Sequence, residues 1–593
     1  MEYNLNKPAE GRVRNSTWGP LGKLLSLMSH ERPRLIAAFV MIMANSGLNL
    51  IGPWLSAIVI DRYILAKPAN YDEVLRYALI FLSMFVVALG TGYTQTRLMA
   101  GFGQRVLFTL RNSIFAKLQE LPVAFFNQNK AGDLISRVNN DTDKLNQFFS
   151  QSLMQFLSSI FIMMGASIFM LCLNFRLALA TLAPAAVLYL FTKATSAWVK
   201  RQNARNMKST GGLSAEIQES LQNFKVIIAF NRRDYFREKF QEANRQNYKT
   251  AIGAGIANNL FTPVYGLLAG IGQLVVLLYG IHLIYQGQGQ AHAFKIGELV
   301  AFLSYTVNFY NPLRQLAALW ANFQVALAGW DRISAILNLE TNIRTLPGLA
   351  DAAQPTLLSF RNVSFHYPDG KEVLHDISFD LDRGKTYAFI GPTGGGKTTT
   401  ANLIARLYDP SKGSVWLDGR DIRTYDAAER SQKIGFILQE PILFSGTLKE
   451  NILYGNAAYS LLDQEQLLDV LNKEGLGDLL ERFDAGLDTP VASGGETLSL
   501  GQRQLIAFMR AVLRHPDILI LDEATANIDT VTEQLLESIL RKLPETTTRV
   551  IIAHRLNTIE SADGIYFVNS GEVVRAGSLQ DAVGMLLSGK RVS

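Results

Sequence analysis

Long apolar segments, all but the last of them uncharged, dominate the first half of the chain, and polar stretches separate them. The apolar segments are six in number: Leu35–Ile60, Tyr77–Thr96, Leu145–Phe175, Leu177–Thr192, about Pro263–Tyr285 within the charge-free run Thr250–Phe294, and Leu299 to about Phe323. About 20 apolar residues are enough to cross a bilayer as a helix. A large soluble helical core would instead alternate apolar faces with charged ones, so the pattern predicts six membrane helices.

The connections between these segments are of two kinds. Those after the first, third and fifth segments are short, whereas Arg97–Lys144 and Lys193–Lys249 are long and rich in Lys and Arg. Basic loops stay on the cytoplasmic side of a membrane, which places both long loops and both chain termini inside the cell. Within these loops, Pro122–Phe126 and about Ala215–Asn223 are candidate short helices that press on a cytoplasmic domain. An amphipathic helix, Trp18–His30, is expected at the membrane surface before the first span.

Arg314 lies inside the sixth apolar segment and allows two interpretations. An ionisable group at membrane depth is a functional candidate by default. The alternative is that Arg314 lies near water at the helix end or makes a structural pair. Both interpretations stay open at the level of the sequence.

A change in composition marks a second domain. From Thr356 onward, strands and helices alternate with glycine turns, and Leu358–Phe365 has the period-two alternation of a half-buried strand. We expect a membrane domain over residues 1–330, a linker over 331–355 and a cytoplasmic α/β domain over 356–593. The chain is 48% hydrophobic with a net charge of only +6 over 593 residues, which fits a membrane protein and does not indicate nucleic-acid binding.

The phosphate-binding pattern G-x-x-x-x-G-K-[ST] follows a predicted buried strand, Tyr387–Ile390. It consists of Gly391, Pro392, Thr393, Gly394, Gly395, Gly396, Lys397 and Thr398, and Thr399 continues into a helix. Glycines let backbone N–H groups close around phosphate oxygens, and the positive end of the helix faces the same anion. Lys397 is expected to reach the β- and γ-phosphates, and the Thr398 hydroxyl to ligate Mg²⁺. The sequence therefore predicts a site for ATP with Mg²⁺.

Further downstream, an apolar strand ends in two carboxylates, Asp522 and Glu523. Asp522 can hold Mg²⁺ through water and Glu523 can polarise the attacking water, which is the division of labour that phosphoryl transfer needs. Ser499 precedes another apolar helix, which it can cap while that helix presents its positive end to a phosphate.

With these motifs in this order, the chain resembles the ATP-binding cassette family, specifically a half-transporter of the exporter type, over essentially its whole length. The resemblance implies a membrane all-α domain of six transmembrane helices fused to a C-terminal α/β P-loop nucleotide-binding domain. It implies that Tyr367 stacks on adenine and that Gln439 contacts Mg²⁺ and takes part in catalysis. It further implies that His554 contacts the γ-phosphate and that Asp529 lies in the loop that crosses to the opposite cassette.

The resemblance also implies a role for the signature segment, Leu498-Ser-Leu-Gly-Gln502. In the family this segment, with Ser499, Gly501 and Gln502, completes the ATP site of a partner cassette. Leu500 stands where the family has glycine, and a branched side chain should weaken this close contact. The chain's own ATP site is intact, so it is similar to the competent subunit of heterodimeric exporters. We expect a second half-transporter with an intact signature as partner; a homodimer that tolerates Leu500 is the alternative.

For function, the resemblance implies an ATPase that drives efflux of hydrophobic or amphiphilic drugs or lipids by alternating access across a bacterial inner membrane. The spans are rich in Met and aromatic residues, including Met163, Tyr305 and Tyr310, and adaptable apolar linings suit such cargo. Each of these residues has packing as its alternative role. Membrane lipid and a hydrophobic small molecule are the other expected partners. Alternative functions are a lipid or peptide exporter of narrow specificity, and a regulatory subunit that binds ATP without turnover.

Overall fold

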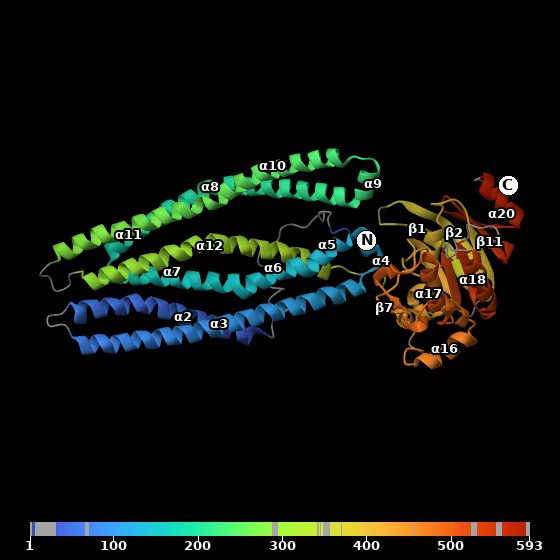
Figure 1. The fold of residues 1–593 in the computed structure, drawn as a ribbon, viewed down its shortest axis with the longest axis horizontal. Coiled ribbons are helices and arrows are strands. Elements are labelled where there is room, and N and C mark those ends of the chain that lie inside the picture. The colour runs from blue at the N-terminus through green and yellow to red at the C-terminus, as the bar shows by residue number, and fades with distance from the viewer. Residues whose placement is uncertain are drawn as a thin grey trace. The chain divides into compact units, whose positions relative to one another are not determined.

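The structure is a computed structural model of the chain (Figure 1). It describes residues 3–5, 31–65, 70–287, 294–340, 343, 345–347, 356–368, 370–456, 458–522, 530–552 and 560–588. The chain divides into two compact units. We call them the helical unit, formed by Ala9–Lys117 and Gly132–Asn338, and the α/β unit, formed by Met1–Pro8, Leu118–Ala131 and Leu339–Ser593. The predicted amphipathic helix Trp18–His30 lies outside the described residues.

Long helices make up the helical unit (Figure 1). They are α2 (Arg32–Val59), α3 (Tyr71–Glu120), α7 (Leu153–Leu173), α8 (Phe175–Gln222), α10 (Arg233–Asn259), α11 (Phe261–Gln286) and α12 (Ile296–Leu337). Shorter elements connect or extend them: η2 (Ile60–Ile64), α5 (Ala131–Ser136), η3 (Arg137–Asp141), α6 (Thr142–Gln147), η4 (Phe148–Ser152) and α9 (Phe224–Ala229). Among the described residues, five helical stretches are long and apolar enough to cross a membrane. They correspond to the first five predicted spans; the sixth predicted span, Leu299 to about Phe323, lies inside α12, which is not one of the five.

Two buried tyrosines of α12 connect this helix to α2, α7 and α8. The Tyr305 hydroxyl donates to the Leu50 carbonyl of α2 at 2.8 Å, and the Tyr310 hydroxyl donates to the Thr181 carbonyl of α8 at 2.8 Å. The Tyr305 ring also stacks on Phe169 of α7, with ring centroids 5.2 Å apart. Both tyrosines are almost fully buried inside this unit. They are therefore packing residues, and the hypothesis that they line a cargo path is not supported.

Two predicted boundaries in the helical unit need correction. The second candidate short helix, Ala215–Asn223, belongs to the end of α8; the short helix is α9, which begins after Asn223 leaves helical geometry. The predicted linker 331–355 begins inside α12, which continues to Leu337. The reason is that Trp330, Ile333 and Ile336 keep helical spacing and are all buried, so the apolar face of α12 continues beyond the predicted sixth span.

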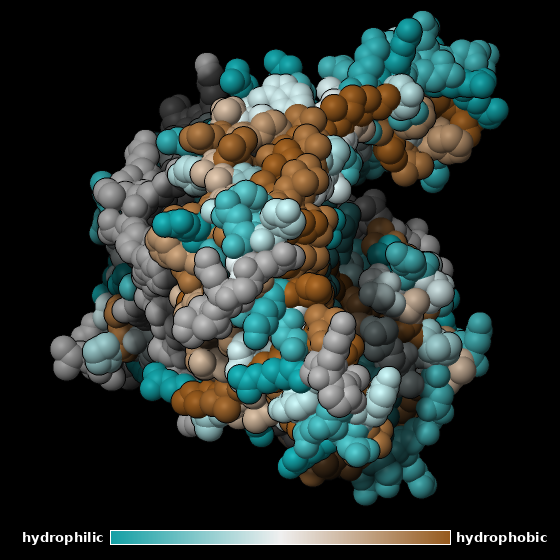
Figure 2. Space-filling model, turned by 90° about the vertical axis from the view of Figure 1, so that its left-hand side faces the viewer, coloured by the Kyte–Doolittle hydropathy of each residue, from teal (hydrophilic) through white to brown (hydrophobic). Residues whose placement is uncertain are grey.

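Apolar side chains cover much of the outside of the helical unit. On α3, Phe85, Leu89 and Tyr93 are 67%, 75% and 66% exposed. Figure 2 looks onto the end face at the left of Figure 1, where broad hydrophobic areas also reach the surface. Such a surface suits contact with lipid or with another membrane helix. Arg314 of α12 is exposed as well, and it forms no ion pair with a described residue.

The α/β unit contains two main sheets. The antiparallel sheet has the order β2-β1-β4-β5, made of β1 (Thr356–His366), β2 (Glu372–Asp382), β4 (Lys412–Leu417) and β5 (Arg420–Asp421). The six-stranded sheet has the order β12-β11-β3-β10-β9-β6, made of β3 (Thr386–Ile390), β6 (Ile434–Ile437), β9 (Ile518–Asp522), β10 (Thr548–Ile552), β11 (Gly564–Asn569) and β12 (Glu572–Ala576). In this sheet β11, β3, β10, β9 and β6 are parallel, so their carboxyl ends lie along one edge.

Helices and a small ribbon complete the α/β unit. The helices are α13 (Lys397–Ile404), α14 (Ala427–Lys433), α15 (Leu448–Ile452), α16 (Gln464–Lys473), α17 (Leu500–Val512), α18 (Thr530–Lys542) and α20 (Leu579–Ser588); β7 (Gly446–Thr447) pairs with β8 (Pro490–Val491). On α17, apolar positions recur at the helical period: Leu505, Phe508, Met509 and Val512 are all buried. They form one core with α15, α16 and β9, which holds α17 against the sheet.

A short helix from the first long loop belongs to the α/β unit. This helix, α4 (Val123–Gln128), follows α3 directly in sequence. The side-chain amide of Asn127 donates to the Tyr408 hydroxyl at 2.8 Å, so α4 contacts the domain that carries the phosphate loop. The prediction of a short helix at Pro122–Phe126 is therefore confirmed, with bounds Val123–Gln128, and the helix contacts the α/β unit.

The first residues of the chain fold onto α4. Tyr3 is 2% exposed and its ring packs edge-on against Phe125 with centroids 6.4 Å apart. Its backbone N–H donates to Gln128 Oε1 at 2.8 Å, and its carbonyl accepts from Asn129 Nδ2 at 2.9 Å. The Tyr3 hydroxyl donates to the Glu340 carbonyl at 3.2 Å. These contacts hold α4 to the α/β unit independently of Tyr408.

Replacing Tyr305 with Phe tests the packing role of this residue. The substitution keeps the ring and removes the hydrogen bond to the Leu50 carbonyl. We expect a loss of about 0.6 kcal/mol, and at most about 1.7 kcal/mol, as is typical for hydrogen bonds between membrane helices. The apparent melting temperature in lipid nanodiscs should fall, whereas Tyr285→Phe on α11, where Tyr285 is 74% exposed, should leave it unchanged. Equal melting temperatures for both variants would contradict the account.

Candidate nucleotide-binding site

The phosphate loop connects β3 to α13 at the carboxyl edge of the six-stranded sheet. Gly391 has a φ of 144°, and a Cβ at this position would collide with the Val568 carbonyl of β11. Gly396 is the N-cap of α13 with a φ of 117° and offers no side-chain cap to the helix. The first backbone N–H groups of α13 therefore have no partner from a capping side chain. Such a helix end, preceded by a glycine loop, is suited to binding phosphate.

Lys397 is positioned within the loop that precedes it. Its side chain is buried, with the residue 6% exposed, and the amine donates to the carbonyls of Gly391 (2.8 Å) and Pro392 (3.1 Å). The loop thus holds the positive charge of Lys397 against its own carbonyl oxygens. Thr398 is exposed in the first turn of α13, while Thr399 is buried. The predicted phosphate-binding residues are therefore together in one loop and helix.

Parallel strand pairing brings two further predicted residues to the same edge. Asp522 ends β9 and lies opposite Ile552 of β10, which in turn lies opposite Phe389 of β3. Gln439 follows β6, whose Ile437 lies opposite Leu521 of β9. Asp522 is 5% exposed, so a carboxylate is buried at the edge to which the phosphate loop belongs.

Three predicted residues lie outside the described part of the chain: Glu523, Asp529 and His554. Glu523 directly follows β9, and His554 comes shortly after β10. Both strands end at the edge that carries the phosphate loop. Their roles stay predictions.

Tyr367, the predicted adenine-stacking residue, lies beside the phosphate-loop helix. Its hydroxyl is hydrogen-bonded to the Thr399 hydroxyl at 3.1 Å. Its ring packs edge-on against Phe365 of β1, with centroids 4.9 Å apart, and against Tyr408, with centroids 5.3 Å apart. An aromatic ring is therefore fixed next to the loop that would hold the phosphates.

The signature segment forms the start of α17. Ser499 caps this helix: its hydroxyl accepts from the Gln502 backbone N–H at 3.2 Å, and the Gln502 side chain accepts from the Ser499 N–H at 3.0 Å. This arrangement is a capping box. Ser499 is exposed, and Leu500 and Gly501 are half-buried at the positive end of the helix. The predicted cap on α17 is confirmed.

The residues present fit a magnesium ion through mixed oxygen donors. Among the described residues, no group of three or more His, Cys, Asp and Glu side chains could hold a metal ion. The remaining donors at this edge are the Thr398 hydroxyl, the Gln439 amide and the buried Asp522 carboxylate. Mg²⁺ prefers oxygen ligands and is usually held by one or two carboxylates together with substrate phosphates. The donor set is therefore appropriate only in combination with a bound nucleotide.

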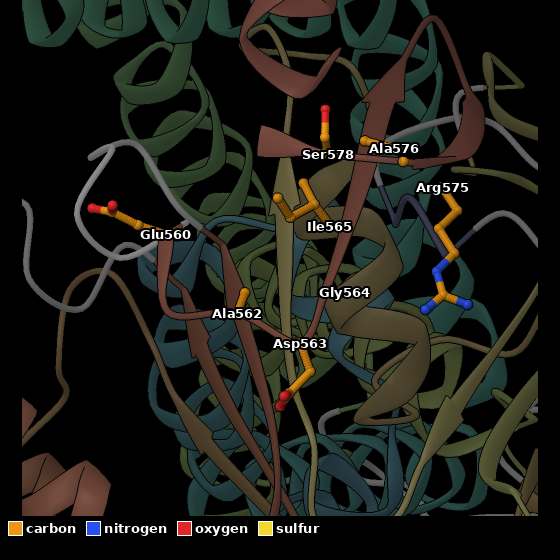
Figure 3. A pocket seen from close by; sticks show the side chains of 9 residues that line it. Glu560, Ala562, Asp563, Gly564, Ile565, Arg575, Ala576 and Ser578 are labelled. Carbon is orange, nitrogen blue, oxygen red and sulfur yellow. The ribbon is translucent and has the colours of Figure 1, made fainter. Parts of the chain in front are cut away.

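A second cavity lies at the opposite edge of the same sheet. It has a volume of about 490 Å³ and is lined by the segment that leads into β11, the start of β11, the end of β12 and the two residues that follow β12 (Figure 3). Its charged groups, Glu560, Asp563 and Arg575, point away from one another (Figure 3). Asp563 accepts a hydrogen bond from the Thr386 N–H, at the amino end of β3, at 2.8 Å. This cavity is therefore separate from the phosphate-loop edge.

Asn127 and Tyr408 are residues near the site that the sequence analysis did not identify. Tyr408 touches the ring of Tyr367 and is hydrogen-bonded to α4. Neither residue belongs to a phosphate-binding pattern, and their pairing joins segments that are distant in sequence. Tertiary packing alone reveals them.

The fold and the site together define a class. The chain combines long apolar membrane helices with a P-loop ATP-binding domain. This combination is typical of multi-pass membrane proteins that use the energy of a nucleotide. Two family models match it: the ABC transporter transmembrane region over residues 35–313 and the ABC transporter domain over residues 374–526. The chain belongs to the ABC transporter family, and its α/β unit is an ABC ATPase domain coupled to transport.

Individual relatives match most of the chain. The fatty acid ABC transporter ATP-binding/permease protein of Mycobacterium bovis is 32% identical, over 86% of this chain and 79% of its own length. The probable multidrug resistance ABC transporter ATP-binding/permease protein YheH of Bacillus subtilis is 31% identical, over 83% of this chain and 72% of its own length. The structure of a bacterial Atm1-family ABC exporter with ATP bound matches with a TM-score of 0.77 at 24% identity, covering 93% of this chain and 97% of that one. This likeness shows that the fold is that of an ABC exporter.

Replacing Lys397 with Ala tests the phosphate loop. A hydrogen bond to a charged group contributes about 1.5–3 kcal/mol, so the Kd for ATP should rise at least about tenfold. Lys385→Ala is the matched control, because Lys385 lies just before β3, its side chain is 51% exposed, and it pairs with Asp382 at 2.7 Å. Binding of a fluorescent ATP analogue measures both variants. Equal affinities of the two variants for ATP would show that Lys397 does not contribute to ATP binding.

Proposed function

We propose that this chain is one half of a dimeric ABC exporter that uses ATP to move hydrophobic or amphiphilic compounds out across a bacterial inner membrane. The observation that carries the proposal is the convergence of Lys397, Thr398 and Asp522 on one sheet edge, in a chain whose other unit consists of apolar membrane helices. A module that only binds nucleotide has no need of such helices.

The cargo class is supported by composition and by the relatives. The apolar segments of the helices carry very few charges, so they offer apolar contacts to a cargo. One relative is named for fatty acids and another for multidrug resistance, and both cargo types combine a large apolar part with a polar end or group. We therefore propose amphiphiles as the cargo class. An exporter of narrow specificity for one lipid or peptide is the alternative.

Residues of the α/β unit divide the work of hydrolysis between them. Tyr367 stacks on adenine, and Lys397 with the α13 N-terminus holds the phosphates. Thr398, Gln439 and Asp522 hold Mg²⁺, which neutralises phosphate charge when bound. Glu523 orients and polarises the attacking water, and His554 contacts the γ-phosphate. Tyr367 follows β1 in sequence, and the other residues lie at or after the ends of β3, β6, β9 and β10 in sequence; the individual roles are those that the family resemblance implies.

The signature segment supports an asymmetric dimer. Half-transporters of this family dimerise, and an exposed Ser499 at the positive end of α17 is available to the nucleotide of a partner cassette. The family resemblance assigns Asp529 to the loop that would cross to that partner. Leu500 adds a branched side chain at the first position of α17, where the family has glycine. We propose that the partner is a different half-transporter with an intact signature, so that this chain's own ATP site is the competent one.

ATP turnover by the isolated chain tests the asymmetric dimer. On our proposal, the purified chain in nanodiscs hydrolyses ATP slowly, because Leu500 obstructs each site of a homodimer. Leu500→Gly should then raise the rate at least about tenfold, which corresponds to about 1.4 kcal/mol of transition-state stabilisation. Co-expression with the partner half-transporter should raise it without any substitution.

Two controls make this result specific. Glu523→Gln should abolish turnover in every preparation, and Leu461→Gly, at a site that is 96% exposed, should have no effect. Full turnover by the unmodified chain alone, unchanged by Leu500→Gly, would show a homodimer that tolerates leucine. Turnover that survives Glu523→Gln would contradict the assignment of the catalytic carboxylate.

A further inference from the structure

A pocket with a mixed polar and apolar lining lies inside the helical unit. It has a volume of about 260 Å³ and is formed by residues of α2, α3 and α12. Apolar side chains of α3, among them Met84 and Phe85, line one side, and three polar residues belong to the rest of the lining: Asn49, Ser56 and Ser304. None of the described residues that line it carries a charge. A few polar groups among apolar side chains are typical of small-molecule sites.

The two serines of this pocket donate their hydrogens to the helix backbone. The Ser56 hydroxyl donates to the Pro53 carbonyl at 2.7 Å, and the Ser304 hydroxyl donates to the Val300 carbonyl at 3.1 Å. A hydroxyl that has donated its single hydrogen can only accept, through its two lone pairs. Both serines therefore offer acceptor oxygens to the pocket.

Asn49 is oriented in the same sense. Its amide nitrogen donates to the Asn45 carbonyl at 2.9 Å and to Asn45 Oδ1 at 3.2 Å. A carbonyl can only accept, so the side-chain atom that faces it is the nitrogen, and no described residue donates to Asn49 Oδ1. Pro53 has no N–H to offer to the Asn49 carbonyl, which lies four residues earlier in α2. Asn49 therefore keeps acceptor capacity on both its side chain and its backbone.

Asn45 fixes the orientation of Asn49 between two helices. The Asn45 amide nitrogen donates to the Ala88 carbonyl of α3 at 2.8 Å and to the Thr91 hydroxyl at 3.1 Å. Its Oδ1 accepts from the Asn49 amide nitrogen. The whole Asn45 amide is thus engaged, so Asn45 holds α2 to α3 and leaves the acceptor of Asn49 for another donor.

The pocket lies toward the outer end of the predicted spans. Asn49 and Ser56 are in the second half of Leu35–Ile60, and Met84 is in the first half of Tyr77–Thr96. The basic loops predict that α2 begins and α3 ends on the cytoplasmic side, so these positions lie in the half of the membrane away from the cytoplasm. An exporter would release its cargo on that side.

The size of the pocket suits only one end of an amphiphile. Its volume of about 260 Å³ is below the range of about 300–1,000 Å³ that is usual for small-molecule sites, so it has room for a polar end and the adjoining carbons. On α3, Leu82, Phe85 and Leu89 share one helix face and are 60%, 67% and 75% exposed. An apolar tail can therefore lie along this face, because Phe85 also lines the pocket.

We propose that this pocket binds amphiphiles whose polar end is an uncharged hydrogen-bond donor, such as the hydroxyl of a long-chain alcohol. The acceptor oxygens of Asn49, Ser56 and Ser304 receive the donated hydrogen. A protonated carboxyl group or an amide N–H meets the same requirement, whereas an ether, an ester or a carboxylate has no hydrogen to donate. A cationic amine has hydrogens, but no described carboxylate lines the pocket to offset the cost of its charge. The inference rests on the proposed function, since it gives the amphiphilic cargo a location and a chemical class.

Competitive photolabelling tests this proposal in the full-length chain in nanodiscs, together with its partner where the dimer requires one. The probe is a long-chain alcohol with a diazirine in its chain, and mass spectrometry should find the label in residues 48–56 and 81–88. Unlabelled alcohol should displace the probe about fivefold more effectively than its O-methyl ether, because one hydrogen bond contributes about 1 kcal/mol. Equal displacement by the two compounds, or a label spread evenly over the membrane helices, would overturn the proposal.

Removing the acceptors tests their role in the preference for a donor. Asn49→Leu combined with Ser304→Ala should weaken binding of the alcohol alone, so that alcohol and ether bind almost equally. A general loss of stability would instead weaken both compounds to the same extent. Ser83→Ala is the matched control, because the Ser83 hydroxyl donates to the Ile80 carbonyl at 2.7 Å on α3, outside the pocket. It should keep the fivefold preference; a double variant that also keeps it would contradict the proposal.

Filling the pocket is an independent test. A Cβ on Gly52 would lie 3.7 Å from Met84 Cε, which is an ordinary contact, so Gly52→Ala should bind the probe normally. The larger side chain of Gly52→Leu should occupy the pocket and remove most of the labelling, while ATP binding is unchanged. Gly47→Leu is the control on the same helix, where a Cβ has nothing within 4 Å. Full labelling of Gly52→Leu would show that the probe binds elsewhere.

Transport measurements distinguish this inference from the proposed function. In proteoliposomes, ATP should move the alcohol several-fold faster than its ether, and Gly52→Leu should move the alcohol several-fold more slowly. If ATP moves both compounds equally and Gly52→Leu transports normally, the inference fails while the proposed function stands. If the probe labels the pocket with the expected preference but ATP moves no amphiphile, the proposed function fails, and the pocket is a binding site for hydrogen-bond donors without a role in export.

Discussion

The site depends on the parallel pairing of β3, β10, β9 and β6. Parallel strands carry their carboxyl ends to one edge, and the backbone hydrogen bonds between them fix the register there. The register places Asp522 opposite Ile552 and Ile552 opposite Phe389, so the buried carboxylate and the phosphate loop meet at that edge. The order of strands in space differs from their order in sequence, which explains why residues more than a hundred positions apart build a single site.

The packing around this edge also explains the requirement for Gly391 and the different roles of two helix N-termini. Gly391 is required because β11 runs beside β3 and brings the Val568 carbonyl close to the loop. The N-terminus of α13 has no capping side chain and is suited to an anion, whereas the N-terminus of α17 is capped by Ser499, which is exposed. The two helix ends are thus suited to different tasks, one within the chain and one between chains. Leu500 lies at the second of these helix ends, so the asymmetry that we propose concerns the dimer and not the chain's own site.

Much of this arrangement was predictable from the sequence, because its signals are local. The phosphate-loop pattern predicts the β3–α13 turn, and charge-free runs predict the membrane helices. Boundaries were less predictable: α12 continues to Leu337 because Trp330, Ile333 and Ile336 find partners in the fold, which composition does not reveal. The roles of Tyr305, Tyr310 and Tyr408 depend on the chain segments that pack against them. The pattern of apolar residues in the sequence cannot distinguish a tyrosine that packs between helices from one that lines a path for the cargo.

The central claim is that nucleotide turnover at this sheet edge drives transport across the membrane. The direct measurement is uptake of a fluorescent fatty acid into proteoliposomes that contain the chain with its partner half-transporter. Only those transporter molecules whose α/β unit faces the outside of the vesicle meet the added ATP, and they should move the fatty acid inward. The account predicts accumulation in the lumen when ATP and Mg²⁺ are added outside, and no accumulation with ADP or without Mg²⁺. Accumulation that is equal with and without ATP, or ATP hydrolysis with no movement of any amphiphile tested, would contradict it.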